Sequence, residues 1–140
     1  MAQITRIFDL QPYYAELFKP KDDVIAGKED GVWVKYSLQE YVAYSDELCF
    51  GMIEMGIKPG DKVATVMNNR PEWNFLDMAI MKAGAIHVPV YPTISKADYQ
   101  YIFKHSGIKL IFVAGEELSK RVMQAAESCE SVCEVFSIKP

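Results

Sequence analysis

Residues 69–93 limit most strongly the folds that this chain can adopt. Their sequence is NRPEWNFLDMAIMKAGAIHVPVYPT. An apolar run at residues 63–67 precedes a helix-like segment, and a second apolar run follows at residues 86–90. Short apolar runs on either side of an amphipathic helix are typical of a βαβ crossover between parallel strands. The stretch therefore predicts a parallel sheet.

The helix in this stretch has clear signals at both ends. Pro71 stands where the first helical residue is expected, and its missing N–H costs nothing there. Glu72 places negative charge at the positive end of the helix dipole, and Gly84 provides a stop. The wide apolar surface between them predicts a helix over residues 71–84 that is buried on more than one side.

The amino-terminal third predicts smaller elements. Helix-like spacing of apolar residues before Pro20 indicates one or two short helical turns. Residues 24–26 and 32–36 are strand formers that flank a polar, glycine-containing loop at residues 27–31. This pattern favours a peripheral antiparallel hairpin.

Two further helices carry capping boxes. Ser37 is followed three residues later by Glu40, and Gly56 follows the apolar face of that helix. Ser95 and Asp98 form a weaker signal of the same kind. These pairs predict helix starts at residues 37 and 95.

The remainder alternates strands with helices. Strands are expected at residues 110–113 and 132–138, and a helix that starts at residues 115–116 carries Leu118, Val122, Ala125 and Cys129 on one face. Four strands in β-α-β-α-β-α-β order predict an α/β fold: an open, mostly parallel, three-layer α/β/α sheet with the peripheral amino-terminal hairpin.

Length and composition narrow the class of protein. The length of 140 residues and the hydrophobic content of 50% predict one domain over residues 1–140. Residues 1–61 would hold the amino-terminal helix, the hairpin and the first long helix, and residues 62–140 the parallel βαβ units. With 15 basic and 19 acidic residues and no basic stripe, no nucleic acid partner is expected.

Targeting signals and cysteines point to the cytoplasm. The sequence contains no secretory h-region and no apolar run long enough to cross a bilayer, so no transmembrane segment is expected. The three cysteines, Cys49, Cys129 and Cys133, are an odd number without an export signal. Free thiols are therefore expected, although the four-residue spacing of the last two would allow them to meet on a helix.

Ligand sites in an open α/β sheet lie at the carboxyl ends of the strands, here residues 68–70, 91–95 and 114–117. Asn68, Asn69 and Arg70 precede a helix and suit either an anion site or ordinary turn chemistry, and the second is the stronger interpretation. The sequence has no G-x-G-x-x-G, no G-x-x-x-x-G-K-[ST], no G-x-S-x-G, no H-E-x-x-H and no C-x-x-C.

The remaining polar and aromatic residues favour structural roles. His87 lies in an apolar strand and His105 at a helix end, and the carboxylates are scattered without an acid–base pair. Several aromatic residues at helical spacing are expected in the core: Trp73, Phe75, Tyr99, Tyr101 and Phe103. No residue is assigned as catalytic, cofactor-binding or metal-binding.

Three motifs of the central stretch resemble a known family. NRPEW (69–73), MKAGA (81–85) and VPVYPT (88–93) are similar to the amino-terminal region of AMP-forming acyl-CoA synthetases, the adenylate-forming superfamily. The segments VKYSLQEY (34–41), GIKPGDKVATV (56–66) and YIFKHSGIKLIFV (101–113) agree with it. The resemblance covers residues 8–138. Within it, the NRPEW motif that opens the central stretch and the YPT that ends it look most like the long-chain fatty acid CoA ligases.

The resemblance implies a parent reaction: ATP, a fatty acid and CoA give acyl-CoA, AMP and pyrophosphate through an acyl adenylate. ATP, Mg²⁺ and CoA would be the cofactors of that parent, and none is expected to bind this fragment. Family members are several times longer, and the parts that perform chemistry, including the Ser/Thr/Gly-rich phosphate loop and the domain with the catalytic lysine, are missing here.

The chain is therefore expected to be an amino-terminal fragment ending at Lys139 and Pro140, structural and inactive alone. Its expected partners are the remainder of the parent chain and other copies of itself, and the parent would be cytoplasmic or peripheral to a membrane. Two alternatives stay open: a standalone α/β binding or interaction module, or another acyl- or aryl-CoA synthetase of the superfamily.

Overall fold

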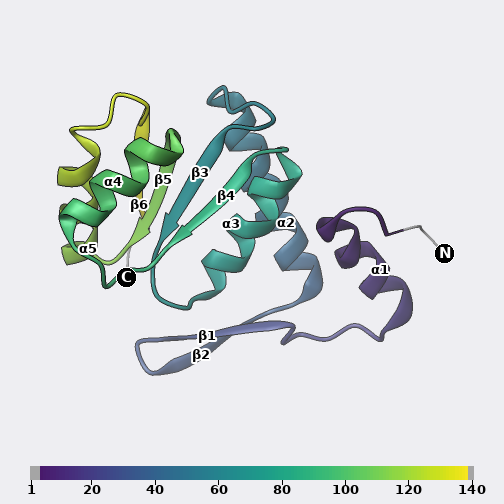
Figure 1. Ribbon diagram of the computed structural model, residues 1–140. Coiled ribbons are helices and arrows are strands. Elements are labelled where there is room, and N and C mark those ends of the chain that lie inside the picture. Colours follow the sequence, from purple (N-terminus) through teal and green to yellow (C-terminus); the bar gives the residue numbers. More distant parts are fainter. Residues whose placement is uncertain (1–3, 139–140) are drawn as a thin grey trace. The chain divides into compact units, whose positions relative to one another are not determined.

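The computed structural model describes residues 4–138 (Figure 1). Residues 1–3 and the expected chain end at Lys139 and Pro140 lie outside the described residues. The elements, in chain order, are η1 (Ile7–Asp9), α1 (Leu10–Leu17), β1 (Ile25–Glu29), β2 (Val32–Tyr36), α2 (Leu38–Glu54), β3 (Lys62–Val66), α3 (Pro71–Lys82), β4 (Ile86–Val90), α4 (Lys96–Ser106), β5 (Ile108–Ala114), α5 (Glu116–Ala126) and β6 (Glu134–Ile138). The predicted α/β class, with a parallel sheet and a small antiparallel hairpin, is confirmed.

The contacts of the chain form two compact units. The first contains Met1–Gly56 and Arg70–Ala83, and the second contains Ile57–Asn69 and Gly84–Pro140. The central stretch therefore gives its helix to the first unit and its strand to the second. A single domain divided at residues 61 and 62 stays a prediction.

The hairpin of the first unit is longer than the sequence suggests. Residues 27–29, predicted as loop, belong to β1, where Gly27 pairs with Val34. Only Asp30 and Gly31 form the turn, with φ values of 47° and 83°. Left-handed backbone at both central residues is the hallmark of a type I′ turn, whose twist matches that of the flanking strands. Cross-strand pairing overrides the weak strand propensity of glycine and lysine here.

The long helix α2 begins as its capping box predicts. The backbone N–H of Glu40 donates to Ser37 Oγ at 3.2 Å, and the backbone N–H of Ser37 donates to Glu40 Oε2 at 2.8 Å. These bonds satisfy two of the backbone donors that a helix start leaves open. The hydrogen bonds that the Glu40 carboxyl accepts from the Ser37 backbone N–H and from Ser37 Oγ lower the pKa of that carboxyl. Met55 caps the other end, directly before Gly56.

An aromatic cluster around Phe75 holds α3 in the first unit. The Phe75 ring is 4% exposed. Its centroid lies 5.2 Å from those of Tyr36 and Tyr44 and 5.7 Å from that of Tyr41. Such offset and edge-to-face contacts add to the stabilisation from buried apolar area. Burial raises the pKa of Tyr41 to about 12.

The second unit is built on a parallel sheet with strand order β4-β3-β5-β6. The apolar strands pack with α4 and α5 into one core, to which Tyr99, Phe103 and Val122 contribute fully buried side chains. Strands β4 and β6 are the two edges of the sheet, and Pro89 lies in β4. Proline is compatible with this place because it occurs in sheets on edge strands.

The carboxyl-terminal part corrects two expectations. Helix α5 ends at Ala126, so Cys129 and Cys133 do not share a helix. Cys129 is buried at 5% exposure while Cys133 is exposed, and residues 127–133 form turns before β6. Strand β6 therefore starts at Glu134 rather than at residue 132. The three thiols are free, as predicted.

None of the helices within residues 4–138 combines the length and the apolar character that a membrane span requires.

Candidate functional site

The carboxyl ends of three strands meet at one edge of the sheet. Val66 in β3 is in register with Val90 in β4 and with Val113 in β5. Asn68 and Asn69 and the loops at residues 91–95 and 114–117 therefore start from the same edge, where open α/β sheets bind ligands. The chemistry available there depends on which polar groups of these loops are already engaged.

The loop after β4 uses its polar groups to hold α4. The Tyr99 hydroxyl donates to the Tyr91 carbonyl at 2.9 Å, and burial raises the pKa of the Tyr99 phenol, which keeps it protonated as a donor. Arg121 Nη1 donates to the Ile94 carbonyl at 3.2 Å. Ser95 caps α4, and its Oγ donates to Asp98 Oδ2 at 2.6 Å. The predicted helix start is confirmed.

The loop after β5 is engaged in the same way. Gly115 is the N-cap of α5, and its carbonyl accepts a hydrogen bond from Ser119 Oγ at 2.8 Å. Glu116 and Glu117 lie in the first turn, exposed, and both accept from Lys120 Nζ, at 2.8 and 3.2 Å. These carboxylates raise the pKa of Lys120. They form a surface ion pair at a helix start and not a pair of acid and base in a cavity.

Arg70, the candidate anion ligand, is bound by the helix that it precedes. Its Nε donates to Glu72 Oε2 at 2.8 Å and its Nη2 to Glu72 Oε1 at 2.6 Å. This bidentate pair lowers the pKa of the Glu72 carboxyl and raises that of the guanidinium. For Arg70 the contacts favour the interpretation as turn chemistry, and for Asn68 and Asn69 that interpretation stays a prediction.

The two histidines have structural neighbours. His87 Nε2 lies 2.8 Å from Thr65 Oγ1, and Thr65 is 1% exposed in the neighbouring strand. His105 stacks on Tyr101, with ring centroids 5.5 Å apart. Tyr101 is 67% exposed, so its predicted place in the core is wrong. Residues two apart on a helix face away from each other, and Tyr99 and Phe103 occupy the buried face.

The residues at the sheet edge do not fit a nucleotide or its metal. A phosphate cradle requires consecutive backbone N–H groups, usually from a glycine-rich loop, and these loops contain only Gly115. Within residues 4–138, no three His, Cys, Asp or Glu side chains gather as metal ligands. No step of an ATP-dependent reaction can be derived from this edge.

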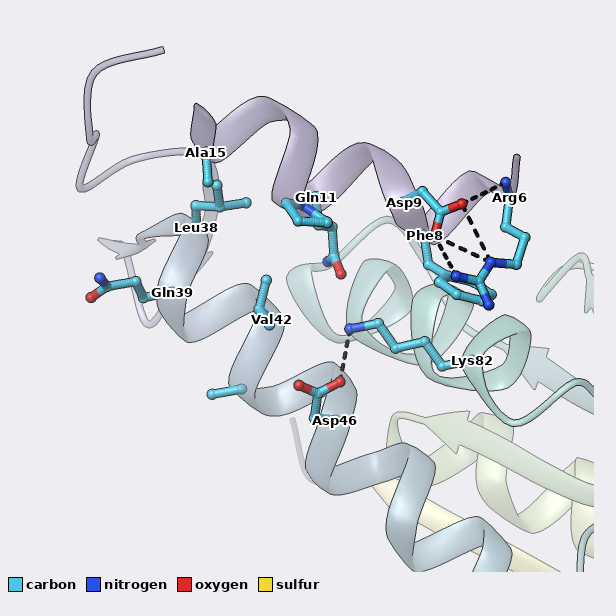
Figure 2. A pocket seen from close by; sticks show the side chains of 12 residues that line it. Arg6, Phe8, Asp9, Gln11, Ala15, Leu38, Gln39, Val42, Asp46 and Lys82 are labelled. Atoms are coloured by element: carbon cyan, nitrogen blue, oxygen red, sulfur yellow. Dashed lines mark hydrogen bonds and ion pairs between the residues drawn. The ribbon is translucent and has the colours of Figure 1, made fainter. Parts of the chain in front are cut away.

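The first unit contains a pocket that was not predicted from the sequence. It has a volume of about 610 Å³ and lies between the η1–α1 segment, α2 and the end of α3 (Figure 2). At one end, Lys82 Nζ binds Asp46 Oδ1 at 2.8 Å. Gln11 of α1 also lines it, and its side chain is buried. The one sequence signal for this place is a glutamine in a helical segment, LQPYYAEL, in which apolar residues predominate.

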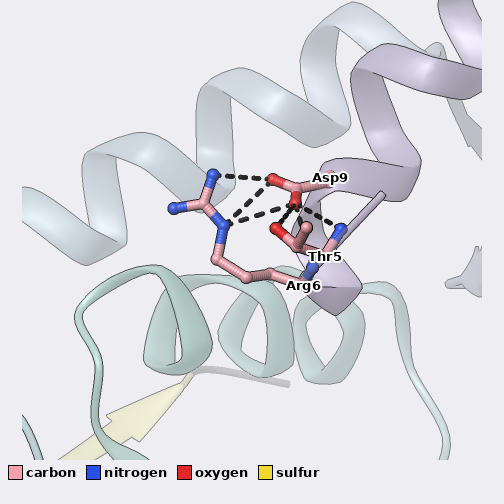
Figure 3. A network of polar contacts seen from close by, with 3 residues as sticks. All are labelled: Thr5, Arg6 and Asp9. Carbon is pink, nitrogen blue, oxygen red and sulfur yellow. Dashed lines mark hydrogen bonds and ion pairs between the residues drawn. The ribbon is translucent and has the colours of Figure 1, made fainter. Parts of the chain in front are cut away.

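A small polar network in the segment before α1 includes two residues of the pocket lining, Arg6 and Asp9 (Figure 3). Arg6 Nη2 donates to Asp9 Oδ1 at 2.8 Å, and Thr5 Oγ1 donates to Asp9 Oδ2 at 3.0 Å. The Arg6 guanidinium holds the pKa of the Asp9 carboxyl well below its usual range. The Arg6 guanidinium also lies 4.5 Å from the centroid of the Phe8 ring. The network fixes the turn that leads into α1.

Comparison with known proteins gives a consistent family. Residues 16–139 match the AMP-binding enzyme family. Over 109 residues the chain is 29% identical to the long-chain-fatty-acid–CoA ligase FadD15 of Mycobacterium bovis, which covers 78% of this chain and 18% of the ligase. It is also 25% identical over 118 residues to an uncharacterized protein of Mycobacterium tuberculosis, a match that covers 84% of this chain and 67% of that protein.

The fold is similar to that of solved structures. A fatty acyl CoA synthetase of Mycobacterium tuberculosis superimposes with a TM-score of 0.80 at 21% identity, covering 95% of this chain and 26% of that one. The chain thus spans about a fifth to a quarter of these longer proteins. The resemblance to the acyl-CoA synthetases seen in the sequence motifs is confirmed, and the chain belongs to the AMP-binding enzyme family.

Proposed function

We propose that the chain is the amino-terminal part of a long-chain fatty acid CoA ligase, in which it acts as scaffold and performs none of the chemistry. The observation that carries the proposal is the family match over residues 16–139 combined with coverage of 18% of the similar FadD15 ligase. The parent would join a fatty acid to CoA through an acyl adenylate, with ATP, Mg²⁺ and CoA as its cofactors.

The scaffold role is supported by what the family motifs do in this fold. In NRPEW, Arg70 and Glu72 pair at the start of α3, and Pro71 is its first helical residue. In VPVYPT, Val90 is the buried last residue of the edge strand β4, and the Tyr91 carbonyl accepts a hydrogen bond from the Tyr99 hydroxyl. These motif residues thus serve helix starts and strand packing, and the loops after β4 and β5 form hydrogen bonds and ion pairs within the chain.

Further partners and the compartment follow from the same proposal. The remainder of the parent chain is the proposed partner, and the exposed apolar side chains of α2 support self-association of the chain by itself. The three free cysteines support a reducing compartment, and we place the parent in the cytoplasm or at a membrane surface facing it.

A standalone binding or interaction module is the second candidate. It is favoured by the uncharacterized protein of Mycobacterium tuberculosis, because this match covers 67% of a relative that is much shorter than the ligases. Such a protein would keep the fold of the family without its phosphate loop.

Two measurements test the proposal. Reading the gene beyond codon 140 separates the candidates, because a serine-, threonine- and glycine-rich phosphate loop in frame supports the ligase and a stop codon supports the module. The purified chain is then incubated with ATP, Mg²⁺, palmitate and CoA, with FadD15 as the positive control. We expect no acyl-CoA from the chain, and turnover by it would overturn the scaffold role.

A further inference from the structure

The pocket of the first unit contains a buried carboxamide without a partner. Gln11 is 4% exposed, and neither its Nε2 nor its Oε1 has a hydrogen-bond partner among residues 4–138. Folded proteins satisfy nearly all buried polar groups, because a buried donor or acceptor that has lost water and gained no partner is destabilising. The amide therefore marks a place where an external donor and acceptor are missing.

The amide lies where a ligand could meet it. The Gln11 side chain points from α1 toward the end of the pocket that Lys82 occupies (Figure 2). The volume of about 610 Å³ falls within the range of small-molecule sites.

The walls of the pocket are mainly apolar. Phe8 and Pro12 contribute from the η1–α1 segment, and Leu38 and Val42 from α2. An apolar surface with a few convergent polar groups is the composition of sites that bind small organic molecules. A ligand for this pocket should have an apolar body and one polar head.

The charged residues that line the pocket argue against a ligand with an ionic head group. Arg6 pairs with Asp9 at 2.8 Å, and Lys82 pairs with Asp46 at 2.8 Å, so each cation of the pocket is neutralised by a carboxylate of the same pocket. A carboxylate or phosphate would have to break one of these pairs to gain a partner. A neutral head group meets no such competition.

We propose that this pocket binds a small neutral amide with an apolar tail. The ligand N–H would donate to Gln11 Oε1, and the ligand carbonyl would accept from Gln11 Nε2, since a carboxamide offers both a donor and an acceptor. The tail would lie against Phe8, Leu38 and Val42. This site is separate from acyl-CoA formation and does not depend on the proposed function.

Hexanamide is the probe, titrated into the isotopically labelled 140-residue chain and followed by NMR. Methyl hexanoate, which has a similar tail and a carbonyl but no N–H, is the matched probe. Hexanamide should shift the Gln11 side-chain amide and the methyl signals of Leu38 and Val42, with a dissociation constant on the order of 1 mM for a ligand of this size. Methyl hexanoate should bind about tenfold more weakly.

Variants assign the effect to the amide. Gln11→Leu should weaken hexanamide binding about tenfold more than it weakens methyl hexanoate binding, because hexanamide loses two hydrogen bonds to the amide and methyl hexanoate, whose carbonyl only accepts, loses one. Gln39→Leu is the matched control, since Gln39 lines the same pocket but is exposed, and it should leave both affinities unchanged. Ala15→Phe, at an exposed position of the lining, should fill the pocket and block both probes without depending on Gln11.

Three results would overturn the proposal. One is the absence of shifts at Gln11 up to about 10 mM hexanamide, well above the affinity expected for such a ligand. Another is equal binding of the two probes to the unchanged chain. The third is a Gln11→Leu chain that is folded by circular dichroism, melts at a higher temperature and binds hexanamide as well as before, because the amide would then be only an unsatisfied group.

Discussion

Gly27 in β1 lies directly against the ring of Pro71, the first residue of α3. A Cβ built on Gly27 would be 2.6 Å from both Cδ and Cγ of that ring. Carbon atoms in contact are normally about 3.5–4.0 Å apart, so there is no room for a side chain. The hairpin can approach the helix start because position 27 has no Cβ.

Gly27→Ala should therefore lower the free energy of unfolding by about 1–3 kcal/mol, the usual effect of forcing an extra carbon into packed structure. Urea denaturation measures the change. Gly51→Ala is the matched control, because Gly51 lies inside α2 with nothing within 4 Å of its added Cβ. It should stabilise the chain by about 0.5–1 kcal/mol. If both variants changed the free energy of unfolding in the same direction, the close packing of Gly27 against Pro71 would be contradicted.

Phe75→Ala should destabilise the chain by about 3–5 kcal/mol, since it removes the ring at the centre of the aromatic cluster and leaves a cavity. Thermal and urea unfolding give the value. Phe50→Ala serves as the control, because this ring is 65% exposed. Its effect should stay within about 0.5 kcal/mol. A small loss at Phe75 would show that the cluster is not part of the stable core.

Helix starts that depend on neighbouring residues could be predicted from the sequence. The bounds of strands, which depend on pairing with another strand, could not. The capping boxes of Ser37 and Ser95 involve neighbours three residues away, so the helix starts were found correctly. The low strand propensity of residues 27–29 predicts a loop, and they form strand only through pairing with β2. Strand β5 likewise begins two residues earlier than expected, at Ile108, which is fully buried.

Glu72→Gln should change the response to acid. Arg70 holds the pKa of folded Glu72 below its ordinary value of 4.5, so the stabilisation is present above that value and is lost as the pH falls through the folded pKa. The variant should be less stable at pH 7 by about 0.5–1 kcal/mol and should lose less on acidification below about pH 5.

Denaturation at a series of pH values from neutral to acidic tests this behaviour. Glu117→Gln is a suitable control, because Glu117 also lies in the first turn of a helix but its side chain is 86% exposed. It should leave the difference between neutral and acidic stability as in the unchanged chain. If Glu72→Gln also leaves this difference unchanged, the ion pair with Arg70 contributes nothing to the pH dependence of stability.

Tyr99→Phe should cost about 1–2 kcal/mol, because it removes the hydroxyl that donates to the Tyr91 carbonyl from a fully buried ring. Hydrogen exchange at the start of α4 should rise together with the loss of stability. Tyr101→Phe, at a ring that is 67% exposed, should change the stability by less than about 0.5 kcal/mol. Equal effects would argue against the role of the bond.

The chain by itself should associate as its concentration rises. Phe50 and Ile53 of α2 are 65% and 49% exposed, and contiguous apolar surface of this kind is usually covered by a partner. Light scattering should show the mass increasing with concentration, and Phe50→Lys should reduce it. Tyr101→Lys, on a different helix, is the control. A constant monomer mass up to about 1 mM would exclude association through this surface.

The pocket around Gln11 could not have been predicted from the sequence. Its lining comes from the η1–α1 segment, α2 and the last residue of α3, and only folding brings Gln11 and Lys82 to the same cavity. A single glutamine in a short helix that also contains Glu16 has no period or spacing that signals a site. The sheet edge was predictable as a location, because its loops follow the strands directly, but the engagement of its polar groups was not.

Pro89 makes the two edge strands of the sheet differ in their backbone hydrogen-bond donors. Proline has no backbone N–H, so β4 lacks one donor, whereas none of the residues of β6 is a proline and all five keep theirs. The two edge strands are therefore chemically unequal: β4 lacks a donor at Pro89, whereas β6 keeps every donor that points away from β5. An added strand, from the same chain or from another, should therefore pair more favourably beside β6 than beside β4.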